Sequence, residues 1–201
     1  MCRKMPMIKT LAHIVHKNAV EHGWWDEERN LYEVLALIHS EWSEALEEAR
    51  ADRPMVYKLD AMNDELRLIT PADEGYKEHP GKPEGIAVEL IDGVIRILDA
   101  FGYYGIETDD RETGQPASIE SLWGKAAVDE NVPEDVATAI ALLHAYTSQV
   151  ILDDNNDPTC LLGAMSLALT WVNMQGIDPL KLLMEKHQYN IGRPYKHGKK
   201  F

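Results

Sequence analysis

Two pairs of acidic residues in this chain could bind a metal ion, and each pair has the spacing of one helical face. Glu41 and Glu44 are three positions apart, as are Glu89 and Asp92, and both pairs lie in segments with helical apolar periodicity. Four carboxylates brought together by two helices would repel one another strongly unless a cation lay between them. Oxygen ligands of this kind suit Mg²⁺, with Mn²⁺ as a substitute. The spacing therefore predicts a metal site and favours an enzyme over a scaffold.

The same periodicity runs through most of the chain and predicts an all-α fold, with no competing strand alternation. The expected helices cover residues 7–22, 30–50, 86–103, 133–152, 158–175 and 179–190. Their expected N-caps are Asn30, Asn131, Asp157 and Asp178, three of which stand one or two residues before a proline. The stretch between the two acidic helices, residues 51–85, is expected to be a long connection with a short helix at about residues 60–68.

Composition limits the classes of function. The chain has 201 residues and a formal charge of -14, which argues against a surface for nucleic-acid polymers or anionic membranes. A free nucleotide is different, because a metal ion can carry its charge into an acidic pocket. The two cysteines, Cys2 and Cys160, form no disulfide or zinc pattern, and no signal peptide or membrane-spanning stretch is evident. We therefore expect a soluble, cytoplasmic protein.

The chain is expected to form a single domain with two halves. The predicted divisions are a metal-binding half at residues 7–106, a linker at 107–132 and a second half at 133–201. The halves echo each other weakly, and in the matching register the four carboxylates correspond to uncharged residues, namely Tyr146, Gln149, Cys160 and Gly163. One interpretation is a tandem duplication, a pseudo-dimer within one chain whose second copy has lost the site. Chance helical periodicity is the other.

These residues resemble a known family. The MazG-like all-α nucleoside triphosphate pyrophosphohydrolases, which are related to the dimeric dUTPases, carry a Glu-Glu-x-x-Glu helix followed by a Glu-x-x-Asp helix. The corresponding segments here are Ser40-Glu41-Trp42-Ser43-Glu44 and Glu89-Leu90-Ile91-Asp92. The chain also resembles the family's Lys-x-x-x-Asn-x-x-Arg-Pro-Tyr ending, through Lys186, Asn190, Arg193, Pro194 and Tyr195. The resemblance covers residues 11–106 and the tail from residue 176.

The resemblance implies a MazG-like helical bundle that hydrolyses a (d)NTP to the (d)NMP and pyrophosphate with Mg²⁺. Glu41, Glu44, Glu89 and Asp92 would hold the metal, and Glu41 or Glu44 would accept a proton from the attacking water. It also implies a homo-oligomer, with a dimer favoured. Ser40 departs from the family pattern, because the first motif glutamate is missing there, and Glu48 is a candidate replacement. Hydrolysis of dUTP, of non-canonical nucleotides or of dNTPs in general would all fit.

The candidate substrate residues each have an ordinary alternative. Lys186, Asn190 and Arg193 have the spacing of one helical face and suit phosphate or base contacts, but a cation there also complements a helix C-terminus. Tyr195 is expected to close over the nucleotide. Trp42 could stack on the base, although aromatic residues at helical spacing more often belong to a core. The alternative to an enzyme is a non-catalytic nucleotide-binding or regulatory protein, which the serine at position 40 would favour.

Overall fold

The computed structural model describes residues 7–62, 65–106, 108, 117–119, 121–122, 132–153 and 155–195, with only the backbone given for residues 61, 62, 65 and 66. Six α-helices dominate the described part of the chain, so the all-α prediction is confirmed at the level of fold class. These helices are α1 (Ile8–Glu21), α2 (Leu31–Arg50), α3 (Ile86–Tyr104), α5 (Val136–Leu152), α6 (Leu161–Met174) and α7 (Pro179–Ile191). A short 3-10 helix, Pro158–Cys160, leads into α6.

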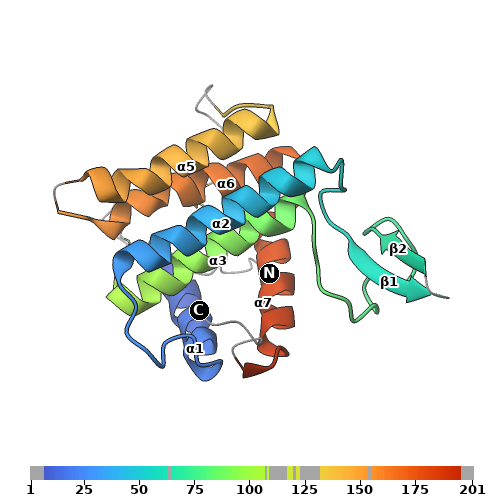
Figure 1. Cartoon of the computed structure of the whole chain (residues 1–201), viewed down its shortest axis with the longest axis horizontal. Helices are drawn as coiled ribbons and strands as arrows, with labels where there is room; N and C mark the ends of the chain where they lie inside the picture. Colours follow the sequence, from blue (N-terminus) through green and yellow to red (C-terminus); the bar gives the residue numbers. More distant parts are fainter. Residues whose placement is uncertain are drawn as a thin grey trace, which may run out of the picture.

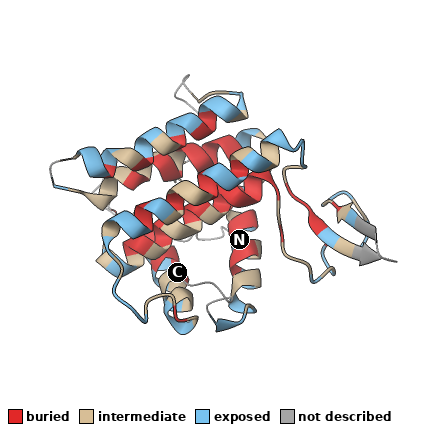
Figure 2. Cartoon of the chain, in the orientation of Figure 1, coloured by how far each residue is buried: buried red, intermediate tan, exposed pale blue. Residues whose placement is uncertain are grey.

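Helix α3 lies at the centre of the arrangement. It packs against α1, α2, α6 and α7, while α5 covers α2 and α6 (Figure 1). The sequence of α3 explains this position, because its only charged residues are Glu89, Asp92, Arg96 and Asp99. Its remaining side chains can be buried on several sides, and Figure 2 shows the buried residues concentrated where these helices meet. The acidic pair of α3 is therefore carried by the most deeply embedded helix.

Capping residues set where the helices begin. Asn30 and Glu33 form a reciprocal capping box at the start of α2, and Asp178 caps α7, as expected. The predicted start of α5 at residue 133 is wrong. Asp135 accepts hydrogen bonds from the backbone N–H groups of Ala137 and Thr138, so the helix starts at Val136. The expected cap Asn131 lies outside the described residues, as does most of the predicted linker.

The connection between α2 and α3 contains a β-hairpin, so the short helix predicted at residues 60–68 is wrong. Strands β1 (Lys58–Met62) and β2 (Glu65–Ile69) pair antiparallel and project from the helices (Figure 1). In this register Leu59 lies opposite Leu68, and Asp60 lies opposite Arg67. Matched apolar and opposite-charge pairs of this kind stabilise a two-stranded ribbon. A helix over the same residues would not align these partners.

The two ends of that connection are fastened to each other, which fixes the approach of α3 to α2. Tyr57 and Glu84 exchange backbone hydrogen bonds of 2.9 and 2.8 Å. Gly85, at the start of α3, has a φ of +114°, and a Cβ there would collide with the backbone carbonyls of Pro54 and Met55. Only glycine combines this conformation with so close an approach. The hairpin therefore extends from a connection whose two ends are hydrogen-bonded to each other.

A close contact between α2 and α3 involves Trp42 and Gly93, the residues that directly follow Glu41 and Asp92. Trp42 is fully buried, its ring lies against the Cα of Gly93, and its indole N–H donates to Thr147 of α5 over 3.0 Å. This large-to-small packing brings the two helices close at the level of the acidic pairs.

Within the described residues, no single helix is long and apolar enough to span a membrane, and only the strongly bent pair Pro158–Met174 and Pro179–Ile191 meets the length and composition criteria jointly.

Replacing Gly93 with alanine should destabilise the protein, because the new Cβ would overlap the Trp42 ring in a closely packed core. We expect a loss of about 1–3 kcal/mol in the free energy of unfolding, measured by denaturant titration with circular dichroism. Gly192→Ala is the matched control, since its nearest non-neighbouring atom would be 3.5 Å away and its φ is −82°. Equal stability of the two variants would contradict the proposed packing.

Candidate metal and nucleotide site

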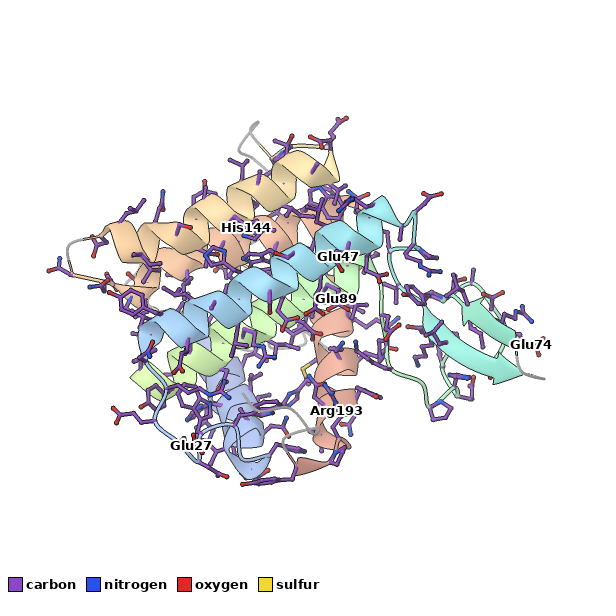
Figure 3. The ribbon with its side chains drawn as sticks, viewed as in Figure 1. Glu27, Glu47, Glu74, Glu89, His144 and Arg193 are labelled. Carbon is purple, nitrogen blue, oxygen red and sulfur yellow. The ribbon has the colours of Figure 1, made fainter. Side chains whose placement is uncertain are left out.

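Three of the four predicted carboxylates lie together. Glu41 of α2 and Glu89 and Asp92 of α3 each present an oxygen atom, and these atoms all lie within 4.8 Å of one another. Glu41 and Glu89 are buried, with 6% and 4% of their surface exposed. In Figure 3, Glu89 is labelled beside the end of α7 that lies nearest to α2 and α3. The two acidic pairs therefore converge as the sequence predicted, but through three residues.

Glu44 does not join this group, and its predicted role as a fourth ligand is not supported. The side chain is exposed, and no oxygen of Glu44 falls within the cluster formed by the described residues. Residues three positions apart on a helix differ by about 60° in direction, and here Glu41 contacts α3 through Arg96 whereas Glu44 faces solvent. Glu44 still acts on the site through its charge, which helps to raise the pKa of Glu41.

Three cationic side chains neutralise the three carboxylates. The Arg96 Nε donates to Glu41 Oε1 over 3.0 Å, and Lys186 Nζ lies 2.7 Å from Asp92 Oδ2. Lys82 Nζ is 3.9 Å from Glu89 Oε1 and 3.4 Å from Glu84. The other carboxylate oxygen of Glu89, Oε2, is buried and has no hydrogen-bond partner among the described residues. A buried carboxylate oxygen in this state is unusual and calls for a ligand.

Burial changes the acidity of the cluster. Desolvation, with the nearby charge of Asp92, raises the pKa of Glu89 to about 8, although Lys186 and Lys82 oppose this shift. Desolvation also raises the pKa of Glu41, again assisted by Asp92 and opposed by Arg96. Both shifts follow from placing like charges in a poorly solvated site. A divalent cation would favour the ionised forms of both groups.

A pocket of ≈ 80 Å³ opens beside the cluster and is lined by residues from α1, α2, α3 and α7. Glu41 and Asp92 form part of its wall, together with the cations Arg96 and Arg193. The pocket therefore combines metal-ligand carboxylates with anion-binding groups. Its other lining residues are Val15, Asn18, Ala19, Trp24, Ile95, Asp99, His187 and Asn190.

The structure separates the residues predicted to bind substrate. Asn190 and Arg193 line the pocket, and Asn190 Oδ1 is buried without a hydrogen-bond partner in the described part of the chain. Lys186 instead points into the carboxylate cluster and also donates to the carbonyl oxygen of Pro83 over 3.2 Å. Tyr195 is 60% exposed, and its hydroxyl donates to Asp26, which belongs to the segment connecting α1 to α2. Its closure over a nucleotide stays a prediction.

Trp42 cannot stack on a nucleobase in this arrangement, so that prediction is corrected. Its side chain has no exposed surface, and its indole N–H already bonds Thr147. The aromatic residue in the pocket wall is Trp24, from the segment after α1. Helical spacing alone does not separate a core tryptophan from one that stacks on a base, because it does not show which face of α2 is covered by α5.

Arg96 and Lys82 were not assigned to the site from the sequence, although one signal was present. Arg96 is four residues after Asp92 and seven after Glu89, so all three share one face of α3. Lys82 precedes that helix, and its contact depends on the closure between Tyr57 and Glu84, for which the sequence offers no periodic signal.

Comparison of the chain with models of protein families, with curated proteins and with solved structures finds no match in any of the three. The function is therefore inferred from the site itself.

The raised pKa of Glu89 has a consequence for stability in the absence of divalent metal. Its pKa is about 8 in the folded chain and near 4.5 in an unfolded one, so the folded state holds an extra proton between these values. The contribution of Glu89 to stability therefore falls as the pH rises through this window. In the presence of a metal chelator, the thermal stability of Glu89→Gln should rise relative to that of the wild type as the pH is raised from about 5 to about 9.

The exposed residue Glu47 supplies the control, because Glu47→Gln should keep a constant difference from wild type across the same range. Melting temperatures from circular dichroism would measure both differences. A pH-independent difference for Glu89→Gln would show that this carboxyl group is not perturbed as described.

Proposed function

We propose that this chain is a Mg²⁺-dependent nucleoside triphosphate pyrophosphohydrolase of the MazG-like type, which converts a (d)NTP to the (d)NMP and pyrophosphate. The observation that carries the proposal is the convergence of Glu41, Glu89 and Asp92 from two helices beside a pocket whose wall includes Glu41, Asp92 and Arg193. Carboxylates for a hard cation and a guanidinium for phosphate are the two requirements for handling a triphosphate. The order of the motifs along the chain agrees with the resemblance.

The donor set suits the proposed ion. Three carboxylate oxygens close to one another are hard ligands, and Mg²⁺ normally keeps several positions for water and phosphate. Oε2 of buried Glu89, which has no hydrogen-bond partner among the described residues, supports this assignment, because a buried carboxylate oxygen normally has a partner. Once bound, Mg²⁺ would neutralise charge on the phosphates and lower the pKa of a bound water.

The residues of the chain would perform the remaining tasks. Hydrolysis joins the oxygen of a water molecule to the α-phosphorus and breaks the bond from that phosphorus to the oxygen bridging to the β-phosphorus, so that pyrophosphate leaves. We assign Glu41 as the group that accepts the proton of this water, because it faces the pocket and its pKa is raised. Arg193 would hold phosphate oxygens, and Asn190 Oδ1, which has no partner among the described residues, would accept a hydrogen bond from the substrate.

We also infer that the second half of the chain is a degenerate copy of the first, with α5 and α6 corresponding to α2 and α3. Two contacts between α2 and α5 support this. His39 meets His144, with their Nδ1 atoms 2.8 Å apart, and Trp42 bonds Thr147. Both pairs are 105 positions apart, which is also the offset of the sequence match between α2 and α5. Contacts between equivalent residues are expected where a pseudo-twofold axis relates two helices.

The degenerate copy would explain why only one site is expected per chain. Glu41 and Asp92 correspond to Tyr146 and Gly163 in this register. The Tyr146 ring lies close to Gly163, so that a Cβ at Gly163 would be 2.9 Å from Cδ1 of the ring. An aromatic ring and a glycine thus occupy the position of two carboxylates. Association of whole chains into a homo-oligomer stays a prediction.

A non-catalytic nucleotide-binding protein is the second candidate. It is favoured by the three ion pairs, which already balance the cluster without a metal, and by Ser40, whose hydroxyl donates to the carbonyl oxygen of Leu37 within α2. Release of pyrophosphate from a panel of canonical and modified NTPs, with and without Mg²⁺, separates the two functions.

Asp92→Asn and Glu41→Gln should each reduce metal-dependent pyrophosphate release by a factor of about 100 or more, because they remove a metal ligand or the proton acceptor. The helical circular dichroism should be retained. Glu47→Gln, an exposed change on the same helix as Glu41, should leave the rate within about twofold. Wild-type rates in the two site variants would refute the site, and no release by the wild type from any NTP would favour the binding protein.

A further inference from the structure

Lys186 is the most deeply buried charged side chain of the site. Only 1% of its surface is exposed, and its ammonium group lies 2.7 Å from Asp92 Oδ2 and 3.2 Å from the carbonyl oxygen of Pro83. A buried ammonium group is stable only with such partners, and Asp92, whose side chain is 16% exposed, is stabilised by the cation in return. The pair therefore holds α7 against α3.

The three cations differ in how closely they hold their carboxylates. Lys82 is more exposed and lies 3.9 Å from Glu89, and Arg96 reaches Glu41 at 3.0 Å from a more open position. Lys186 makes the shortest and least exposed of these contacts. A divalent cation that used an oxygen of Asp92 would stand close to this ammonium group, and like charges at such a distance repel strongly. Lys186 and a divalent cation therefore compete for Asp92.

The position of Lys186 on α7 determines what the ammonium group meets when it leaves Asp92. Asn190 and Arg193 follow at spacings of four and seven residues on the same helix or just beyond it, and both line the pocket. A lysine side chain is a flexible stem with a compact charge, so its ammonium can turn without moving the helix. The carbonyl oxygen of Pro83 offers a partner that does not depend on Asp92.

We propose that Lys186 is an exchangeable counter-ion: its ammonium group holds Asp92 in the metal-free site and turns to a phosphate group of the nucleotide when a divalent cation takes Asp92. This inference rests on the proposed function and adds regulation to the same site. Cation and triphosphate then bind cooperatively, because the cation releases the ammonium and the phosphate gives it a new partner. By linkage, each ligand strengthens the binding of the other by the same factor.

The test is a titration of the full chain with Mn²⁺, followed by electron paramagnetic resonance, with and without a non-hydrolysable nucleoside triphosphate analogue. We expect the analogue to tighten Mn²⁺ binding by a larger factor in the wild type than in Lys186→Met. Without the analogue, Lys186→Met should bind Mn²⁺ about tenfold more tightly than wild type, because the competing charge is gone. Lys186→Arg keeps the charge and should stay near the wild-type affinity.

Lys181→Met is the matched control, since Lys181 is an exposed lysine on the same helix, and its Mn²⁺ affinity should not change. Unchanged or weaker Mn²⁺ binding by Lys186→Met would overturn the inference while leaving the metal site intact. If the wild type binds no Mn²⁺, or if Glu89→Gln does not weaken that binding, the proposed metal site fails and the inference fails with it.

A measurement on the wild type keeps the inference falsifiable if Lys186→Met does not fold. The Nζ resonance of ¹⁵N-labelled Lys186, identified by its loss in Lys186→Arg, should shift on addition of Mg²⁺ and shift again with the triphosphate analogue. A resonance that stays in place while Mg²⁺ binds would mean that Lys186 remains on Asp92, and would overturn the exchange.

Discussion

The placement of three carboxylates, two of them buried and Asp92 half-buried, within a few ångströms of one another is the constraint on which this structure depends. Like charges in a poorly solvated space are costly, and the same desolvation and repulsion raise the pKa of Glu89. The fold offsets this cost with Arg96, Lys82 and Lys186, which come from α3, from the connection before α3 and from α7. The helices that supply the charges are therefore also held together by them. Removing one partner would leave an uncompensated charge inside the protein.

Packing beside the cluster keeps the carboxylates in place despite their repulsion. Trp42 and Gly93 directly follow Glu41 and Asp92, and their contact lets α2 and α3 approach closely at that level. The closure of the chain between Tyr57 and Glu84 fixes the beginning of α3 on the other side. A site of this kind is prepared before any ligand arrives, because rigid elements rather than loops carry its three acidic residues.

Much of the fold and part of the site could be predicted from the sequence. Helical periodicity and the capping residues Asn30 and Asp178 located the main elements, and the spacing of the acidic pairs predicted their convergence. The hairpin was missed because its strands are short, and their register shows only when both are aligned, as for Asp60 and Arg67. An interpretation that considers only helices does not reveal such cross-strand pairs.

The differences between the expected and observed surroundings of the site residues have a common physical origin. The roles of Trp42, Glu44 and Lys186 depend on which helix covers each face, and local spacing does not specify tertiary neighbours. Trp42 faces α5 and Gly93, Glu44 faces solvent, and Lys186 reaches Asp92 across the contact between α3 and α7. The spacing thus identified candidate residues, whereas the packing assigned their partners.

The central claim is that Glu41, Glu89 and Asp92 bind a divalent cation. A crystal of the full chain grown with Mn²⁺ and examined by anomalous diffraction tests this most directly. We expect an anomalous peak among the oxygens of these three residues, with Oε2 of Glu89 as one of the ligands of the ion. A cluster without a peak, in which Lys186 and Arg96 keep their contacts with the carboxylates at saturating Mn²⁺, would contradict it.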